Sequence, residues 1–103
     1  IAQEEIFGPV LSVIAHDGVD DAVALANDSK YGLCGSVWGG DAAEAADVAR
    51  RVQTGTIGVN HFAMAFGAPF GGFKDSGLGR ELGPEGLEAY LQSKSISLDP
   101  AAG

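Results

Sequence analysis

Glu5 and Phe7, near the start of the chain, are the two side chains whose types and spacing best suit the binding of a polar ligand. A carboxylate accepts charge-assisted hydrogen bonds from hydroxyl groups, and a phenyl ring two residues later can support a ligand by apolar contact. Gly8 and Pro9 follow directly and form a rigid turn that would aim both side chains. For an isolated Glu-x-Phe, the simpler interpretation is a solvated acid and a core aromatic residue, so the pair gains weight only from the rest of the chain.

A second group of side chains lies in a glycine-rich stretch, residues 61–83, which is predicted to be a long loop. A loop this long inside a compact domain is usually functional. Its first part is apolar and aromatic, as a pocket for a hydrophobic small molecule would be, although the same residues would also suit a core. No Arg or Lys lies between Asn60 and Phe70, which argues against a ligand that bears a carboxylate. The side chains of this group are His61, Phe62, Met64, Phe66 and Phe70.

The single cysteine, Cys34, is not predicted to be a nucleophile. It falls inside a predicted strand, between Leu33 and Gly35, and we interpret it as a buried structural thiol. No metal site is expected, because His16 and His61 are far apart in the sequence and no further ligand stands at metal spacing. The glycines match neither a dinucleotide fingerprint nor a phosphate loop.

The first half of the chain alternates strand and helix signals that would position these side chains. Residues 10–14 are a short β-branched apolar run that predicts a buried strand, and residues 19–27 predict a helix. Residues 31–38 and 56–60 predict two further strands, with a second helix between them. Two successive strand–helix–strand units predict parallel pairing, and therefore an α/β fold.

The second helix carries the clearest local signals. Asp41 and Glu44 form a D-x-x-E capping pattern, in which each side chain is placed to satisfy free amides at a helix start. The residues that would form its buried face recur at i, i+3, i+4 and i+7. They are Ala45, Val48, Ala49 and Val52. Farther on, Pro84 stands where helices like to begin, and residues 94–98 alternate as a terminal strand would.

Composition excludes several classes of protein. A chain of 103 residues is one domain at most, and 46% apolar residues argue against disorder. A formal charge of −8, with six Lys and Arg residues in total, argues against a nucleic-acid partner. No apolar run approaches the roughly 20 residues of a membrane span. A lone cysteine excludes an internal disulfide and favours the cytoplasm.

Several motifs stand in the order in which NAD(P)-dependent aldehyde dehydrogenases carry them. Residues 5–9, Glu-Ile-Phe-Gly-Pro, resemble the signature that lies at the nicotinamide end of that family's cofactor site. Asn60, followed by Pro-Phe-Gly-Gly-Phe-Lys-Asp-Ser-Gly at residues 69–77, resembles a second signature of the family. The resemblance continues at residues 26–28, 31–33 and 79–83, and at Tyr90 and Lys94. Because the ordered set covers almost the whole chain, the chain is identified as a member of this family.

The resemblance implies a cofactor role for the opening motif. Glu5 would accept hydrogen bonds from both hydroxyls of the nicotinamide ribose, which fixes the ring for hydride transfer. Phe7 would support the nicotinamide side of the pocket. The cofactor would be NAD or NADP, a choice that the family makes at the adenosine ribose, in a Rossmann half that this chain lacks.

The resemblance also implies roles in the later loop. Phe66 and Phe70 would line the pocket for the aldehyde, and Phe70, inside the motif, is the better supported contact. Glu81 resembles a glutamate assigned to a proton relay near the nucleophile's water channel. A structural carboxylate, paired with Arg80 or with backbone amides, is the alternative for Glu81. Lys74 and two residues later Ser76 are predicted to hold the loop rather than to react.

In the family, a cysteine thiolate attacks the aldehyde, a hydride passes to the nicotinamide, and an activated water hydrolyses the thioester. The nucleophile and the general-base glutamate would lie upstream, so no catalytic residue is assigned within this chain. We therefore expect the C-terminal, parallel-sheet part of an α/β catalytic domain over residues 1–93. An oligomerisation strand is expected over 94–98 and a tail over 99–103. Alone, the chain is predicted to be inactive.

Two other functions stay open. One is a non-catalytic, stand-alone packing or oligomerisation module. The other is an acylating semialdehyde dehydrogenase, which uses the same scaffold with coenzyme A as acceptor. The expected partners are an aldehyde, the remainder of the parent chain, and further copies in a dimer or tetramer. An isolated chain would expose an unpaired edge at residues 94–98 and would tend to self-associate.

Overall fold

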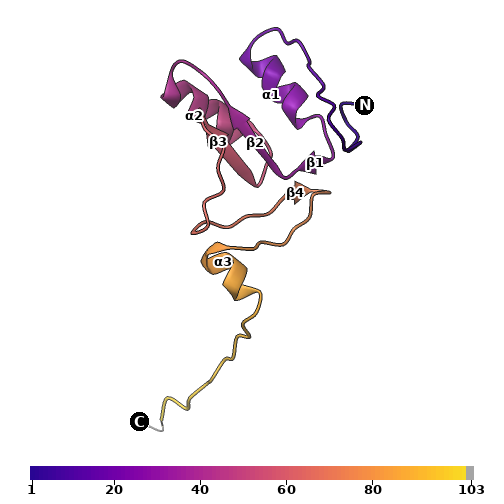
Figure 1. Ribbon diagram of the computed structural model, residues 1–103. Coiled ribbons are helices and arrows are strands. Elements are labelled where there is room, and N and C mark those ends of the chain that lie inside the picture. Colours follow the sequence, from indigo (N-terminus) through magenta and orange to yellow (C-terminus); the bar gives the residue numbers. More distant parts are fainter. Residues whose placement is uncertain (102–103) are drawn as a thin grey trace.

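The protein, described here for residues 1–101 by a computed structural model, is elongated, with principal extents of 68 × 32 × 23 Å. Helices α1 (Val19–Asn27) and α2 (Ala42–Arg51) lie at one end with strands β2 (Cys34–Val37) and β3 (Thr56–Val59) (Figure 1). Helix α3 (Gly83–Glu88) lies below this body, and the chain then runs away from it toward the C-terminus. The described chain contains no helix of the length and apolarity that crossing a membrane requires.

Helix α1 spans the residues that the sequence predicts. It follows Gly18, whose φ of 98° suits a glycine and sharply redirects the chain. Asp20 and Asp21 lie in the first turn, where negative charge is favourable. The Asp21 carboxylate also accepts a hydrogen bond from the backbone N of Asp17 at 2.8 Å, which fixes the approach to the helix.

Helix α2 confirms Asp41 as the predicted cap, whereas the side chain of Glu44, the other member of the pattern, accepts no hydrogen bond from a backbone amide of the described residues. Its predicted buried face is present, with Val48 and Val52 half-buried. The Asp41 carboxylate accepts hydrogen bonds from the backbone N atoms of Ala43 at 2.8 Å and Glu44 at 3.0 Å. Ala45 and Ala49 are 4% and 5% exposed and form the buried face of the helix. With Val23 of α1 they are the buried hydrophobic residues of the described chain.

Strands β2 and β3 are parallel and are connected by α2, as predicted. Cys34 lies opposite Thr56, and Val37 lies opposite Val59. Beyond the strands, the Asn60 side chain accepts a hydrogen bond from the backbone N of Gly39 and donates one to its carbonyl oxygen, both at 2.8 Å. This pair of bonds holds together the carboxyl ends of the two parallel strands.

The single strand predicted over residues 31–38 is divided at Leu33. Its first part is strand β1 (Tyr31–Gly32), which pairs in antiparallel fashion with strand β4 (Phe73–Lys74). Its second part is β2, which pairs with β3. The division coincides with a change of partner, because β4, which comes from the predicted loop, forms a separate two-stranded sheet with β1. The prediction of one long loop over 61–83 is correspondingly wrong at β4.

The strand predicted over residues 10–14 is absent, and with it the first predicted parallel unit. This segment is extended beside α1 with its side chains exposed (Figure 1). A β-strand requires a ladder of hydrogen bonds to a neighbouring strand, and the described residues supply none here. Residues 94–98 likewise form no strand within the described chain, so their pairing with another subunit stays a prediction. Of the predicted tail, residues 102–103 lie outside the described part.

The described structure exposes far more surface than a folded protein of this mass. Its accessible surface is 8080 Å², whereas a folded monomer of 10.5 kDa exposes about 5,400 Å². The radius of gyration is 19.2 Å, against about 13 Å for a compact chain of this length. Many large apolar side chains are exposed, among them Leu11, Trp38, Leu78 and Tyr90. Apolar surface on this scale is usually covered by other protein.

Candidate functional site

The opening motif presents its two predicted cofactor residues to the outside. Glu5 is exposed and lines a hollow of about 540 Å³ together with Cys34, Asp75 and Ser76. Its carboxylate makes no hydrogen bond or ion pair with another described residue. Phe7 is 79% exposed and has a φ of 54°, an uncommon conformation for a bulky side chain.

A residue that the sequence analysis did not select, Gln3, fixes this motif to the fold. Its Nε2 donates hydrogen bonds to the carbonyl oxygen of Asp28 at 2.9 Å and to Asp28 Oδ2 at 2.8 Å. Asp28 is the C-cap residue of α1. No composition or spacing signal marks Gln3, because a side-chain amide acquires this role only through a partner 25 residues away.

Within the predicted loop, Phe70 and Glu81 lie side by side. Their backbones form an isolated antiparallel bridge, with hydrogen bonds of 2.7 Å from Phe70 N to Glu81 O and 2.8 Å from Glu81 N to Phe70 O. Phe70 is half-buried, and the side chain of Glu81 is exposed. The substrate contact and the relay glutamate predicted from the sequence are therefore adjacent parts of one hairpin.

Arg80 closes the same hairpin and does not pair with Glu81. Its Nη1 donates to the carbonyl oxygens of Gly72 and Gly79, both at 2.8 Å, and its guanidinium lies 5.8 Å from the centroid of the Phe73 ring. A pair with Arg80, which is one form of the structural alternative for Glu81, is therefore not present in the described residues. Within residues 1–101 the Glu81 carboxylate has no hydrogen-bond partner.

The prediction that Lys74 and Ser76 hold the loop is confirmed. Lys74 Nζ donates to the carbonyl oxygens of Asn27 at 2.8 Å and Ser29 at 2.9 Å. Ser76 Oγ accepts a hydrogen bond from the backbone N of Gly32 at 3.0 Å. Both contacts join the loop to the end of α1 and the start of β1.

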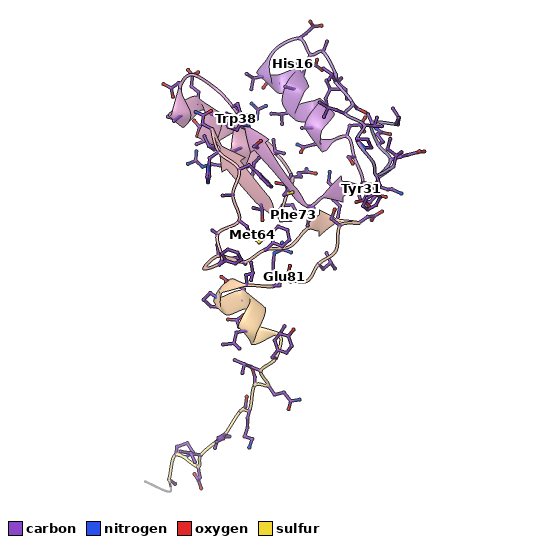
Figure 2. All side chains as sticks on the ribbon, in the orientation of Figure 1. His16, Tyr31, Trp38, Met64, Phe73 and Glu81 are labelled. Carbon is purple, nitrogen blue, oxygen red and sulfur yellow. The ribbon has the colours of Figure 1, made fainter. Side chains whose placement is uncertain are left out.

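Two hollows meet at Ser76. Glu5 lines the first, and Phe70 and Glu81 line the second, of about 370 Å³. Leu33 and Ser76 belong to both, so Glu5 and the Phe70–Glu81 hairpin lie beside two hollows that share these residues. Figure 2 shows Glu81 below the paired strands.

Phe66 is not gathered into this arrangement. Its side chain is 77% exposed, and it belongs to the preceding part of the loop, which also carries Met64 (Figure 2). Glu5, Phe70 and Glu81 therefore line hollows that share Ser76, whereas Phe7 and Phe66 line neither of them.

Cys34 is exposed, which corrects the prediction of a buried thiol. Strand β2 has a paired neighbour on one edge only, and its face toward α1 is incompletely covered, so the thiol reaches solvent. No described residue forms a hydrogen bond with Cys34 Sγ. The described residues also contain no group of three or more His, Cys, Asp or Glu side chains placed to hold a metal ion.

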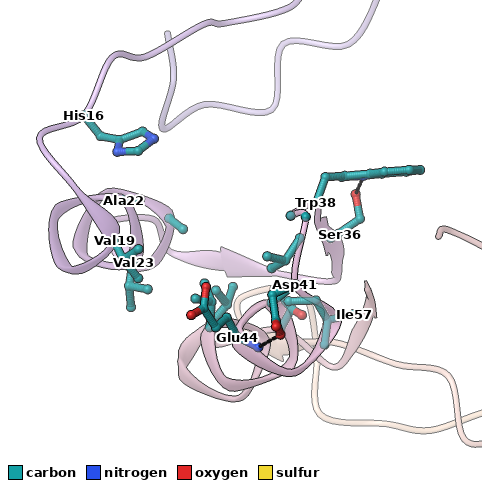
Figure 3. A pocket seen from close by; sticks show the side chains of 18 of the residues that line it. His16, Val19, Ala22, Val23, Ser36, Trp38, Asp41, Glu44 and Ile57 are labelled. Carbon is teal, nitrogen blue, oxygen red and sulfur yellow. Dashed lines mark hydrogen bonds between the residues drawn. The ribbon is translucent and has the colours of Figure 1, made fainter. Parts of the chain in front are cut away.

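The widest hollow is an apolar seam between α1 and the sheet with α2 (Figure 3). It measures about 560 Å³ and is lined by residues such as Val19, Val23, Val48 and Ile57, with His16 on the α1 side. Of the residues considered for chemistry in the sequence, only Cys34 and His16 line it, and neither is assigned a chemical role. The seam reflects loose packing of α1, since most of its lining carries no polar group that would orient a ligand.

Residues 1–96 match the aldehyde dehydrogenase family. The chain belongs to the aldehyde dehydrogenase family. Among relatives of this aldehyde dehydrogenase sequence, geranial dehydrogenase of Castellaniella defragrans is 57% identical over 98 residues, which are 95% of this chain and 20% of that protein. The chain thus spans about a fifth of the length of the curated relatives it matches.

Solved aldehyde dehydrogenases share its fold. The Mycobacterium tuberculosis aldehyde dehydrogenase complexed with NAD+ matches with a TM-score of 0.92 and 54% identity, over 95% of this chain and 20% of that one. Betaine aldehyde dehydrogenase from Staphylococcus aureus, in complex with NAD+, matches with a TM-score of 0.85 and 50% identity, over 89% of this chain and 18% of that one. The α/β arrangement described above is therefore an arrangement found within complete aldehyde dehydrogenases.

Proposed function

We propose that this chain is the C-terminal, parallel-sheet part of the catalytic domain of an enzyme that oxidises an aldehyde to a carboxylic acid with NAD or NADP. The observation that carries the proposal is the meeting at Ser76 of the free Glu5 carboxylate and the Phe70–Glu81 hairpin. Family membership and the NAD+ found in two similar structures support it. The cysteine nucleophile, the general base and the Rossmann half would come from the rest of the polypeptide.

The residues of the first hollow suit the nicotinamide ribose. Glu5 offers two carboxylate oxygens that no described side chain uses, and adjacent ribose hydroxyls are matching donors. Phe7, held outward at a left-handed turn, is free to cover one side of the ring. The bound dinucleotide supplies the hydride acceptor, and the chain's own contribution is to orient it.

The residues of the second hollow suit the aldehyde end of the site. Phe70 provides an apolar contact, and Glu81 provides a carboxylate with no described partner, whose oxygens are available to exchange a proton with water in the complete site. Phe66 would line the same site only if contacts with other parts of the protein moved its segment toward Phe70 and Glu81. The apolar side chains of Leu33 and Phe70 favour a hydrophobic aldehyde, although Arg80 and Glu81 also line this hollow.

The exposed surface disfavours a stand-alone module. The excess over a compact monomer is about 2,700 Å², which exceeds the roughly 800 Å² that each partner contributes to a standard protein–protein interface. Residues 94–98, which are extended and apolar at Ile96 and Leu98, are proposed to pair in an intersubunit sheet of a dimer or tetramer. A cytoplasmic location is proposed on the single free thiol alone.

The test is an assay of the natural full-length polypeptide that contains this sequence. Purified protein is mixed with NAD+ or NADP+ and a series of aldehydes of increasing chain length, with and without coenzyme A. We expect aldehyde-dependent reduction of the dinucleotide and release of a carboxylic acid. Reduction that requires coenzyme A would favour the acylating alternative, and no reduction with any aldehyde would overturn the proposal.

A further inference from the structure

The C-terminal end of α1 is a junction at which three distant segments meet. The Asn27 side chain accepts a hydrogen bond from the backbone N of Gln53 at 2.8 Å and donates one to the carbonyl oxygen of Arg51 at 2.9 Å. These bonds fix the helix end to the turn that leads into β3. Gln3 reaches the same end from the opening motif, through Asp28.

Lys74, in the loop, contacts the same C-terminal end of α1 and supplies a positive charge that the helix itself lacks there. The last turn of α1 contains no basic residue, although the carbonyl oxygens of a helix end favour a cation. Lys74, 47 residues later, donates to Asn27 O and Ser29 O at 2.8 and 2.9 Å. Its own φ is 54°, a strained conformation that persists only where the surroundings hold it.

A series of hydrogen bonds and strand pairings connects Lys74 to the predicted substrate residues. Asp75 N donates to Lys30 O at 2.9 Å, and Lys74 itself pairs with Tyr31 across β1 and β4. On the other side of β4, Gly72 O accepts from Arg80, which adjoins the Phe70–Glu81 bridge. Each contact in this series is a backbone pairing or a single side-chain hydrogen bond. We therefore expect a shift of residue 74 to move the hairpin.

We propose that Lys74 is a positioning residue, which holds the Phe70–Glu81 hairpin in register with the Glu5 motif by binding the same helix end that Gln3 binds. The inference rests on the proposed function, since it assigns the two halves of that site to one anchor. Lys74 positions the Phe70–Glu81 hairpin on the substrate side of the site, and Gln3 positions the Glu5 motif on the cofactor side.

The test compares Lys74→Met with Lys30→Met in the full-length protein. Both changes remove one ammonium group, but Lys30 Nζ lies over the Tyr31 ring, 5.2 Å from its centroid, and donates no hydrogen bond within the described residues. For Lys74→Met we expect the KM for the aldehyde to rise about tenfold, which corresponds to ~1.4 kcal/mol, while the KM for the dinucleotide stays within about twofold. Lys30→Met should leave both values unchanged.

A purely structural role predicts a different result. If Lys74 only stabilises the fold, both KM values and kcat would change together with the unfolding temperature, and that outcome would overturn the proposal. An aldehyde KM equal to that of the wild type in a folded Lys74→Met protein would overturn it as well. The reverse pattern is expected for Gln3→Ala, with a raised KM for the dinucleotide and an unchanged KM for the aldehyde.

Lys74→Gln covers the case in which the methionine variant does not fold. The amide keeps a donor for one carbonyl oxygen and loses the charge. The KM of this variant for the aldehyde should therefore lie between the wild-type value and the value, raised about tenfold, that is expected when both hydrogen bonds are lost. A wild-type KM in this variant would contradict the proposal. The proposed function fails separately, when the wild-type protein itself oxidises no aldehyde.

Discussion

Individual residues show how far side-chain roles can be inferred from sequence. Asp41 could be assigned as a helix cap, because its contacts lie within three residues. Lys74 and Ser76 were correctly assigned to holding the loop, but their partners, 44 to 47 residues away, could not be named. Cys34 was assigned to the interior because its neighbours are small and apolar, yet it is exposed, since burial depends on what covers β2.

Phe70 should determine preference for long aldehydes. Replacing it with Ala removes apolar contact, which is worth ~0.8 kcal/mol for each buried methylene of the substrate. We expect Phe70→Ala to raise the KM for long-chain aldehydes by about tenfold and to leave that for short ones nearly unchanged. Steady-state kinetics over a homologous series measures this directly. An equal effect on all chain lengths would place Phe70 outside the substrate pocket.

Elements were predicted well where their signals are local. The acidic residues of its first turn predict α1, the capping pattern and the 3.6-residue period predict α2, and the prediction of β3 is correct to within a residue. Residues 10–14 and 94–98 have strand-like sequences without strands, because a strand depends on a partner that the described chain does not provide. Strand β4 was missed because two residues in a glycine-rich stretch give no periodicity.

The cap of α2 gives a direct stability prediction. Asp41→Ala removes two hydrogen bonds to backbone amides and should destabilise the protein by ~1 kcal/mol. Asp47→Ala is the control, since it also removes a carboxylate from the helix region but only an exposed pair with Arg50. The free energy of unfolding is obtained from urea titration of both variants. Equal losses would show that the Asp41 cap contributes nothing specific.

The contact between β3 and the loop should tolerate only glycine. A Cβ on Gly55 would overlap the carbonyl oxygen of Gly71, so the loop would have to move away from the strand. We expect Gly55→Ala to destabilise by ~1–3 kcal/mol and to raise the aldehyde KM. Gly40→Ala is the matched control, because nothing lies within 4 Å of a Cβ at that position. A Gly55→Ala protein with the same unfolding midpoint and KM as Gly40→Ala would contradict the close packing described.

The whole molecule explains why the fold class could be predicted and the shape could not. One strand–helix–strand unit and its parallel pairing follow from the sequence, and they are present in β2, α2 and β3. The extended outline, with a radius of gyration of 19.2 Å, does not follow, because periodicity predicts apolar faces but not what covers them. The candidate site was likewise predicted as residue types, while its meeting point at Ser76 came only from the three-dimensional arrangement.

The isolated 103-residue chain should bind a dye that reports exposed apolar surface and should self-associate. It should neither bind a dinucleotide tightly nor reduce one with any aldehyde. Light scattering, dye fluorescence and dinucleotide absorbance measure the three properties. A monomeric, dye-negative chain would contradict the account of its surface, and dinucleotide reduction by it would contradict the assignment of the nucleophile to other sequence.

The most direct test of the central claim, that Glu5 orients the nicotinamide end of the cofactor, is a kinetic comparison of Glu5→Gln and Glu4→Gln in the full-length protein. Both variants lose one exposed carboxylate, and the two positions are adjacent. For Glu5→Gln we predict that kcat/KM for the dinucleotide falls about tenfold or more, because one amide oxygen replaces two charged acceptors. Glu4→Gln should match the wild type. Equal kinetics for the two variants would contradict the claim.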